Sequence, residues 1–338
     1  MKKLRVGVIG AGRIGKVHTE SIVLRVKEAE VVALSDVALE TARQLAGKFG
    51  IPKVTADYKE IFNDKDINAV VICSPTNTHA QYIKEAAAKG KDIFCEKPID
   101  LSLAVIKEAL AAVKKEKVKL MVGFNRRFDA NFLAIRGLVK EGKIGTPHLL
   151  RITSRDPSPP PAHYVAGSGG MFLDMSIHDF DMARYIVGSE VVEVFAKGGV
   201  LVDPELGKAG DIDTAIIMLT FANGAIGAID NSRKAVYGYD QRVEIFGTKG
   251  MAQTANNIPA NYTFNDEKGS HGPHIYNFFM DRYTESYAVE MECFCRAVLK
   301  GECLPVSGED ALAATAMAIA AKISMKENRP VRIDEVVK

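Results

Sequence analysis

Short apolar segments alternate with longer amphipathic ones over residues 1–123 of the chain. The apolar segments predict strands at Leu4–Ile9, Glu30–Ser35, Ala69–Cys73, Asp92–Cys95 and Lys119–Gly123. The segments between them are rich in Ala, Leu, Lys and Glu and predict crossover helices at Ala38–Phe49, His79–Lys89 and Leu101–Lys115. Strands that alternate with helices in this way predict a doubly wound parallel sheet.

The pattern changes after Gly123, where strand-like segments follow one another with turn signals between them. They predict strands at His148–Ser154, Val191–Val202, Thr214–Phe221, Ala225–Asn231 and Arg242–Phe246, and Asn223-Gly224 indicates a hairpin turn. Helices are expected at Met171–Val187, Tyr287–Lys300 and Glu309–Lys326. The second part therefore reads as an α/β domain with a large open, mostly antiparallel sheet.

These patterns predict two domains, 1–123 and 124–338, which suits a chain of 338 residues. A broad sheet with helices on one side only leaves its other face to be covered, so we expect a homo-oligomer. No apolar run approaches the roughly 20 residues of a membrane span, and the N-terminal apolar stretch reads as a first strand rather than a signal peptide.

Charge and cysteine content narrow the partners and the compartment. The net charge is only +2 and basic residues are scattered among acids, so nucleic acid is not expected as a partner. The five cysteines are odd in number and lack metal-finger spacing, as is typical of a reducing compartment. We therefore expect a cytoplasmic globular protein.

The first strand is followed by Gly10-Ala11-Gly12-Arg13-Ile14-Gly15, a GxGxxG sequence that opens a helix. This context predicts a dinucleotide-binding loop rather than an ordinary strand-to-helix turn. Gly10 allows the tight turn, Gly12 lets the backbone approach a pyrophosphate, and Gly15 lets helix and strand pack closely. Arg13 and Ile14, between these glycines, are counted with the cofactor-binding residues.

Asp36 ends the second predicted strand, 21 residues beyond Gly15. A carboxylate at this place accepts hydrogen bonds from the adenosine ribose and repels a 2′-phosphate, which favours NAD over NADP. The alternative is a helix cap ahead of Ala38–Phe49.

The segment after the strand at Ala69–Cys73 lies at the edge where open α/β sheets bind ligands. Its residues are expected to border the cofactor, and they are Ser74, Pro75, Thr76, Asn77 and His79. The alternative is a simple turn in which Thr78 caps the next helix.

Five segments in order resemble the glucose-fructose oxidoreductase/inositol dehydrogenase/rhizopine catabolism (Gfo/Idh/MocA) family. They are GAGRIG, SPTNTHA from Ser74, Glu96-Lys97-Pro98, GFNRRF from Gly123 and LDMSIHDFD from Leu173. The resemblance is strongest to its bacterial inositol 2-dehydrogenases. It implies a Rossmann domain, a second domain with an open sheet, NAD as cosubstrate, no metal, and tetramers formed through the open sheets.

The resemblance also implies roles for three residues, and chemistry supports each. His178 accepts the hydroxyl proton, since an ordinary histidine pKa of about 6.5 lets it be neutral yet basic. Asp174 orients it, and Lys97 donates to the substrate oxygen; Glu96 and Lys97 also border the cofactor. In one helix over Met171–Val187, Asp174, His178 and Asp181 share a face.

A polyhydroxylated ring carries no charge, so several hydrogen-bonding side chains must hold it. The resemblance implies Arg127, Asp156 and Tyr237 for this, and Asp181 is placed with them. The alternatives are an interdomain salt bridge for Arg127, a turn cap for Asp156, packing for Tyr237 and an ion pair with Arg184 for Asp181.

The expected reaction is oxidation of a cyclic polyol by NAD, most specifically myo-inositol to 2-inosose. Another inositol isomer, or an aldose such as glucose, presents nearly the same ring of hydroxyls. Two further alternatives stay open: a metal site at Asp174, His178 and Asp181, and a non-enzymatic NAD-binding sensor. The Pro-rich and Gly-rich residues 157–170 form either a lid or a rigid surface loop.

Overall fold

A computed structural model describes residues 3–337 and divides into two compact units. The first comprises Met1–Phe128 and Thr284–Thr315, and the second Asp129–Tyr283 and Ala316–Lys338. The predicted domain boundary gives Thr284–Thr315 to the second domain, whereas the structure groups this segment with the first. The reason is helix α12 (Thr284–Lys300), which buries one side against α1 (Arg13–Arg25) and the short helix η1 (Asn125–Phe128).

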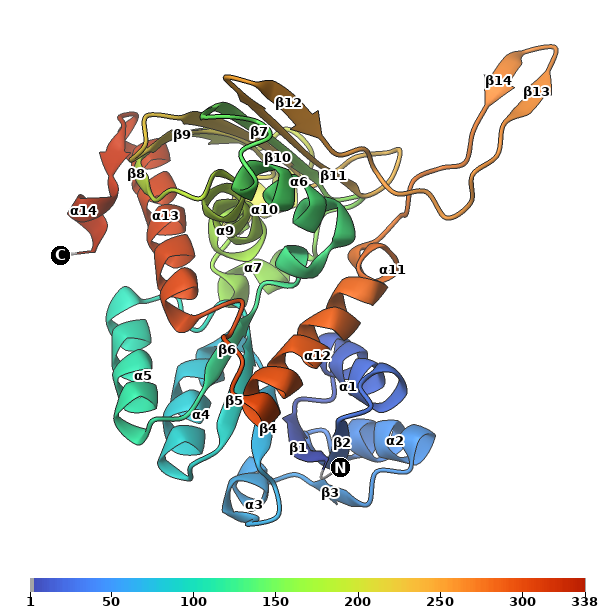
Figure 1. Cartoon of the computed structure of the whole chain (residues 1–338), viewed down its shortest axis with the longest axis vertical. Helices are drawn as coiled ribbons and strands as arrows, with labels where there is room; N and C mark the ends of the chain where they lie inside the picture. Colours follow the sequence, from blue (N-terminus) through green and yellow to red (C-terminus); the bar gives the residue numbers. More distant parts are fainter. Residues whose placement is uncertain (1–2, 338) are drawn as a thin grey trace. The chain divides into compact units, whose positions relative to one another are not determined.

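The first unit holds a six-stranded parallel sheet in the order β3-β2-β1-β4-β5-β6. The strands are β1 (Leu4–Ile9), β2 (Ala29–Ser35), β3 (Lys53–Thr55), β4 (Ala69–Ile72), β5 (Asp92–Glu96) and β6 (Leu120–Gly123). The crossovers are α1, α2 (Leu39–Phe49), α3 (Tyr58–Asn63), α4 (Thr76–Ala88) and α5 (Leu103–Glu116). Figure 1 shows α4 and α5 on one side of this sheet and α1 and α2 on the other. The predicted doubly wound sheet is confirmed.

Burial explains why these strands read as continuous apolar runs. Every residue of β4 is buried, and five of the six in β1 are buried, because helices cover both faces of the sheet. Strand β3 was not predicted, since its three residues are too short to carry a pattern.

The second unit holds a seven-stranded sheet in the order β12-β11-β7-β10-β9-β8-β15. Its strands are β7 (Pro147–Arg155), β8 (Val191–Gly199), β9 (Thr214–Phe221), β10 (Ile226–Ser232), β11 (Asp240–Gly247), β12 (Gly250–Gln253) and β15 (Val331–Arg332). Only the pairing of β10 with β7 is parallel. The predicted mostly antiparallel sheet is confirmed, and so is the hairpin turn, where Gly224 has φ +87°.

Alternation distinguishes this sheet from the first one. In β9 the residues are alternately buried and exposed, because helices cover one face only. Helix α9 (Ser176–Val187) packs on β7 and β10, and α6 (Ala130–Lys140) packs on α9 (Figure 1). The other face exposes apolar side chains, and they are Leu149, Ile216, Met218, Ile226, Phe246 and Met251.

The remaining elements are short, with one exception. They are α7 (Ala162–Ser168), α8 (Met171–Asp174), α10 (Pro204–Lys208), β13 (Phe264–Asp266), β14 (Gly269–His271), α11 (Phe279–Arg282) and α14 (Ile333–Val336). Helix α13 (Gly308–Glu327) is long, and the boundary between the units falls within it. None of the helices in 3–337 has the length and apolarity that crossing a bilayer requires.

Candidate functional site

The glycine loop of the first unit joins β1 to α1, and its three glycines have different surroundings. Gly10 has φ +98°, and a Cβ there would lie 2.5 Å from the carbonyl oxygen of Cys73. A Cβ on Gly15 would lie 1.9 Å from the carbonyl oxygen of Gly10. Around Gly12 nothing lies within 4 Å of such a Cβ. Two glycines thus close the turn, and the third leaves open space at the N-terminus of α1.

Helix α1 begins after Gly12 without a side-chain cap. The N-terminus of a helix carries a partial positive charge and N–H groups that suit an anion such as a pyrophosphate. The open space at Gly12 and the uncapped helix start therefore fit a dinucleotide on geometric grounds.

Asp36 holds the glycine loop through its carboxylate. Its Oδ2 accepts from the backbone N–H of Ala11 at 2.7 Å, and Oδ1 accepts from that of Ala38 at 2.8 Å. Ala38 is the N-cap of α2 and has no capping side chain, so Asp36 bonds the start of this helix from two positions before the N-cap. The side chain remains half-buried. Asp36 thus orders the glycine loop. It also stands at the position where an acid that binds the ribose is expected.

The loop between β4 and α4 is held by its own side chains. The Ser74 and Thr78 hydroxyls lie 2.6 Å apart, and the Thr78 hydroxyl donates to the carbonyl of Pro75 at 2.7 Å. His79 is only 2% exposed, and its ring nitrogens lie 2.7–2.8 Å from the carbonyl oxygens of Ser74 and Pro98. Burial lowers the pKa of His79. The structure thus gives the His79 ring a bridging role between two loops, and its contact with the cofactor stays a prediction.

Behind the Glu96-Lys97-Pro98 segment lies a buried polar cluster. His18 Nε2 lies 2.6 Å from Glu96 Oε1, and both residues are buried. Glu290 of α12 is fully buried, and neither of its carboxyl oxygens has a hydrogen-bond partner within residues 3–337. Burial, and then the charge of Glu96, raise the pKa of Glu290 well above its usual range. Sequence reasoning missed Glu290, which sits in an otherwise ordinary helical pattern.

In the second unit the predicted helix over Met171–Val187 is broken. Helix α8 ends at Asp174, and α9 begins at Ser176, with Met175 between them at φ −96° and ψ −60°. Asp174 and His178 therefore lie on two helices, and the prediction that one continuous helix carries both residues is wrong. Asp181 is fully buried, and Arg184 pairs with Glu190 at 2.6 Å.

Asp174 belongs to a polar cluster that the sequence predicted only in part. Arg233 donates to Asp174 Oδ2 at 3.0 Å and to Asp156 Oδ2 at 3.2 Å. The Tyr164 hydroxyl donates to Asp174 Oδ1 at 3.1 Å. The structure thus brings predicted residues Asp174 and Asp156 together through Arg233, which was not predicted.

Burial of Arg233 opposes its charge, but the carboxylates of Asp174 and Asp156 outweigh this and raise its pKa. Tyr164 lies on α7, inside the stretch 157–170 that was expected to be either a lid or a rigid surface loop. That stretch is therefore partly helical, and Gly169 and Gly170, both at φ +81°, make the sharp bend that follows it. Its action as a lid remains a prediction.

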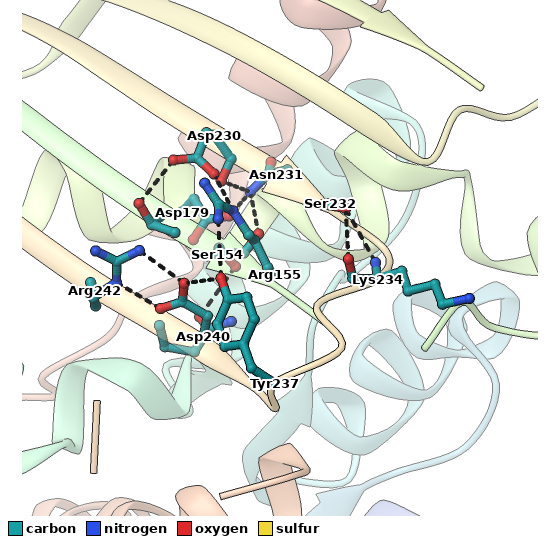
Figure 2. A network of polar contacts seen from close by, with 12 residues as sticks. Ser154, Arg155, Asp179, Asp230, Asn231, Ser232, Lys234, Tyr237, Asp240 and Arg242 are labelled. Carbon is teal, nitrogen blue, oxygen red and sulfur yellow. Dashed lines mark hydrogen bonds and ion pairs between the residues drawn. The ribbon is translucent and has the colours of Figure 1, made fainter. Parts of the chain in front are cut away.

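Tyr237 lies in a second polar network, which Figure 2 shows. Its hydroxyl donates to Asp240 Oδ2 at 2.7 Å and accepts from Arg155 at 3.1 Å. Arg155 also pairs with Asp230 at 2.6 Å. Burial, and then the bond to Asp240, raise the pKa of Tyr237. Tyr237 is 44% exposed, so its ring is not packed in the core as the alternative for it required.

Arg127 of the first unit is 7% exposed and ion-paired. It contacts Asp310 Oδ1 at 2.9 Å and donates to the carbonyl of Pro305 at 3.0 Å. Burial alone would raise the pKa of Asp310, but Arg127 and the Ser307 bonds lower it to about 2. The salt bridge of Arg127 therefore lies within the first unit, unlike the interdomain salt bridge of the alternative, and its contact with the substrate stays a prediction.

The donor set for a metal ion is not assembled in the part of the chain that is described. No group of three or more His, Cys, Asp or Glu side chains between residues 3 and 337 is arranged to hold one. Asp174, His178 and Asp181 thus do not form the ligand set that the metal alternative requires.

Comparison with known proteins covers both units. A family model described as "Oxidoreductase family, NAD-binding Rossmann fold" (GFO/IDH/MocA) matches residues 4–124, and "GFO/IDH/MocA C-terminal domain" matches residues 132–253. The chain is 49% identical over 334 residues to a Thermotoga maritima protein named myo-inositol 2-dehydrogenase, covering 99% of this chain and 100% of the relative. It is 47% identical over 330 residues to an inositol 2-dehydrogenase of Rhizobium meliloti, with coverage of 98% and 99%.

A solved structure gives the same result for the fold. The crystal structure of scyllo-inositol dehydrogenase from Lactobacillus casei with bound NAD(H) and scyllo-inositol has a TM-score of 0.93 at 32% identity. The match covers 98% of this chain and 100% of that chain. The similarity therefore extends over both units of the chain.

Proposed function

The chain belongs to the GFO/IDH/MocA oxidoreductase family, and we propose on that basis that it oxidises a secondary hydroxyl of a cyclic polyol with NAD. The specific reaction is myo-inositol to 2-inosose. The observation that carries this proposal is the full-length similarity, at 49% and 47% identity, to proteins named as inositol 2-dehydrogenases. The alternative substrates are another inositol isomer, such as scyllo-inositol, or an aldose.

NAD, when bound, supplies the acceptor for the hydride that leaves the carbinol carbon. The glycine loop and the N-terminus of α1 hold its pyrophosphate, and Asp36 binds the adenosine ribose. Ser74, Pro75, Thr76, Asn77 and Glu96 border it. The support is the open space at Gly12 and the orientation of Asp36 by the backbone N–H groups of Ala11 and Ala38.

The proton chemistry falls to three side chains. His178 accepts the hydroxyl proton, Asp174 stabilises the imidazolium that results, and Lys97 donates a hydrogen bond to the substrate oxygen as alkoxide character develops. The support for Asp174 is that Arg233 and Tyr164 hold its carboxylate in one orientation. The carboxylates of Asp156 and Asp181 and the hydroxyl oxygen of Tyr237 accept hydrogen bonds from the ring hydroxyls.

We also propose that the protein is a cytoplasmic homotetramer. The exposed apolar face of the seven-stranded sheet supports association, because such a face is costly to leave in water. The occupant we assign to it is the same face of a second copy, as isologous contacts in symmetric oligomers require. The five cysteines are all free thiols, which suits a reducing compartment.

The test is NADH formation from NAD⁺ with myo-inositol, scyllo-inositol, D-chiro-inositol, D-glucose and D-xylose. Turnover led by myo-inositol and lost in Lys97→Ala and His178→Ala supports the proposal. Turnover led by a sugar keeps the chemistry and overturns the substrate. Absence of turnover across the panel, with NADH binding intact, overturns the proposed reaction.

A further inference from the structure

Arg233 is fixed by its backbone before its side chain makes any contact. It follows the last residue of β10, and its N–H donates to the carbonyl of Asp213 at 2.8 Å. Two more backbone bonds lie beside it. The N–H of Asp156 donates to the carbonyl of Ser232 at 2.9 Å, and the N–H of Ala235 donates to the carbonyl of Asp156 at 2.7 Å. The strand end and the residues after β7 are therefore joined, and the direction of the Arg233 side chain is set by the sheet.

The guanidinium spans two carboxylates instead of gripping one. Nη1 lies 3.2 Å from Asp156 Oδ2, and Nη2 lies 3.0 Å from Asp174 Oδ2. The Arg233 side chain is 5% exposed, and those of Asp156 and Asp174 are 24% and 14% exposed. One cation thus faces two anions in a site largely shielded from water, where charges interact more strongly than at the surface. A planar guanidinium suits this geometry, and a lysine ammonium does not.

Asp174 needs such a constraint because of its place in the chain. It is the last residue of the four-residue helix α8, directly before Met175, which separates α8 from α9. A short helix of this kind gives little rigidity, so the contacts of the side chain must fix the carboxylate. Arg233 holds one oxygen and the Tyr164 hydroxyl holds the other.

We propose that Arg233 is a positioning residue of the polyol oxidation, which aligns Asp174 for its work on His178 and Asp156 for its work on the substrate. The inference rests on the proposed function. Two carboxylates that share no cation repel each other and turn apart or take up a proton. Arg233 prevents both, so a catalytic carboxylate and a substrate-binding carboxylate keep a single relative arrangement.

The experiment compares Arg233→Lys and Arg233→Gln with the wild type in steady-state polyol oxidation. Lysine keeps the charge but cannot span both carboxylates, so we expect kcat to fall about 10-fold and KM for the polyol to rise. Glutamine removes the charge, and we expect kcat to fall about 100-fold, the loss that a misplacement of about 1 Å produces. The Kd for NADH should stay within about twofold, because the cofactor-binding residues lie in the other unit.

Arg184 provides the matched control, because it is also an ion-paired arginine of the second unit, and its guanidinium bonds Glu190, a residue outside the proposed site. Arg184→Lys and Arg184→Gln should leave kcat and polyol KM near wild type. Rates are expressed per NADH-binding site, so that misfolded protein does not count as lost activity.

Two results overturn the role of Arg233. One is an Arg233→Lys variant with wild-type kcat and polyol KM. The other is an Arg233→Gln variant that melts earlier but keeps wild-type kcat per NADH-binding site, as a purely structural residue would. A wild type that is itself inactive on every polyol overturns the proposed function, a failure distinguishable from these two.

Discussion

The Nε2 atom of His18 lies 2.6 Å from Oε1 of Glu96, and both side chains are buried within the first unit. Glu290 lies fully buried and interacts electrostatically with Glu96. Two acids in one buried cluster cannot both ionise without a large cost in free energy. Burial, and then the charge of Glu96, raise the pKa of Glu290 well above its usual range, so Glu290 is the acid that stays protonated.

This arrangement predicts how stability depends on pH. The pKa of Glu290 is raised by folding, so the folded state binds a proton that the unfolded state releases above its ordinary pKa of about 4.3. Stability from this group is complete below that pKa and is lost as pH rises toward the folded pKa. Glu290→Gln keeps the shape of the side chain and removes the ionisable carboxyl group, so we expect its Tm advantage over the wild type to grow as the pH rises above about 5.

Thermal melting across that range checks the prediction. Glu290→Ala is the control, since it removes the acid but leaves a cavity, and it should be less stable than Glu290→Gln at every pH. A Glu290→Gln variant whose Tm difference from the wild type does not change with pH would contradict a protonated Glu290.

The cofactor loop gives a second prediction. Asp36→Ala removes the acceptor for the Ala11 N–H and the acid expected at the ribose. We expect kcat/KM with NAD to fall about 10- to 100-fold, and the preference for NAD over NADP to narrow, because the repulsion of a 2′-phosphate is lost. Steady-state kinetics with NAD and with NADP measures both the fall in kcat/KM and the change in preference.

Asp57 is the control for Asp36, since its carboxylate also accepts a backbone N–H, from Lys59 at 2.9 Å at the start of α3. Asp57→Ala should lower stability and leave both cofactor constants near wild type. If Asp36→Ala keeps the wild-type ratio of NAD to NADP efficiency, Asp36 does not face the ribose.

Arg127 and Asp310 give a third prediction, in which the structure and the family resemblance differ. Folding lowers the pKa of Asp310 to about 2, so its contribution to stability is present above the unfolded pKa of about 3.9 and is lost as pH falls toward 2. Asp310→Asn should reduce the free energy of unfolding at pH 7 on the order of 1 kcal/mol, with solvent screening of this partly exposed group allowed for. The variant's deficit should shrink below about pH 4.

Arg127→Met separates the two roles. A salt-bridge residue loses stability on substitution and leaves the polyol KM unchanged, whereas a substrate-binding residue raises that KM. We expect the first result from denaturant unfolding and steady-state kinetics, because Asp310 and Pro305 already engage the guanidinium. A raised KM at unchanged stability restores the substrate role.

Sequence reasoning reached the elements that follow a regular pattern and the residues that follow a motif. The strands of both sheets other than β3, β12 and β15, the glycine loop and the position of Asp36 were predicted, since each depends on residues close in sequence. The family resemblance, drawn from five motifs, is confirmed by matches in both parts of the chain. Asp174 and Asp156 were named for two separate roles, and the sequence did not indicate that Arg233 joins their carboxylates.

The failures have a common cause in contacts between residues distant in sequence. Arg233 is 77 residues from Asp156 and 59 from Asp174, so no local signal marked it. The contact of the His79 ring with Pro98, 19 residues away, likewise has no local signal in the sequence. The break at Met175 interrupts a stretch whose composition favours a continuous helix.

The exposed face of the seven-stranded sheet gives the last prediction. Ile216 and Met218 project from β9 on that face, 53% and 51% exposed. If copies of the chain pair through this face, Ile216→Lys/Met218→Lys places two like charges per copy inside the interface, where burying unpaired charge is costly. We expect light scattering after gel filtration to give a tetramer for the wild type and smaller species for the double variant.

Leu201 is the control, because it is an apolar residue of the same unit that is 78% exposed outside the strands of this sheet. Leu201→Lys should keep the wild-type mass, which separates loss of the interface from a general effect of added charge. A wild type that runs as a monomer contradicts the assembly, whereas a tetramer that survives the double variant assigns the interface to another surface. Far-UV circular dichroism of the double variant should match the wild type, since both side chains point away from the core face of β9.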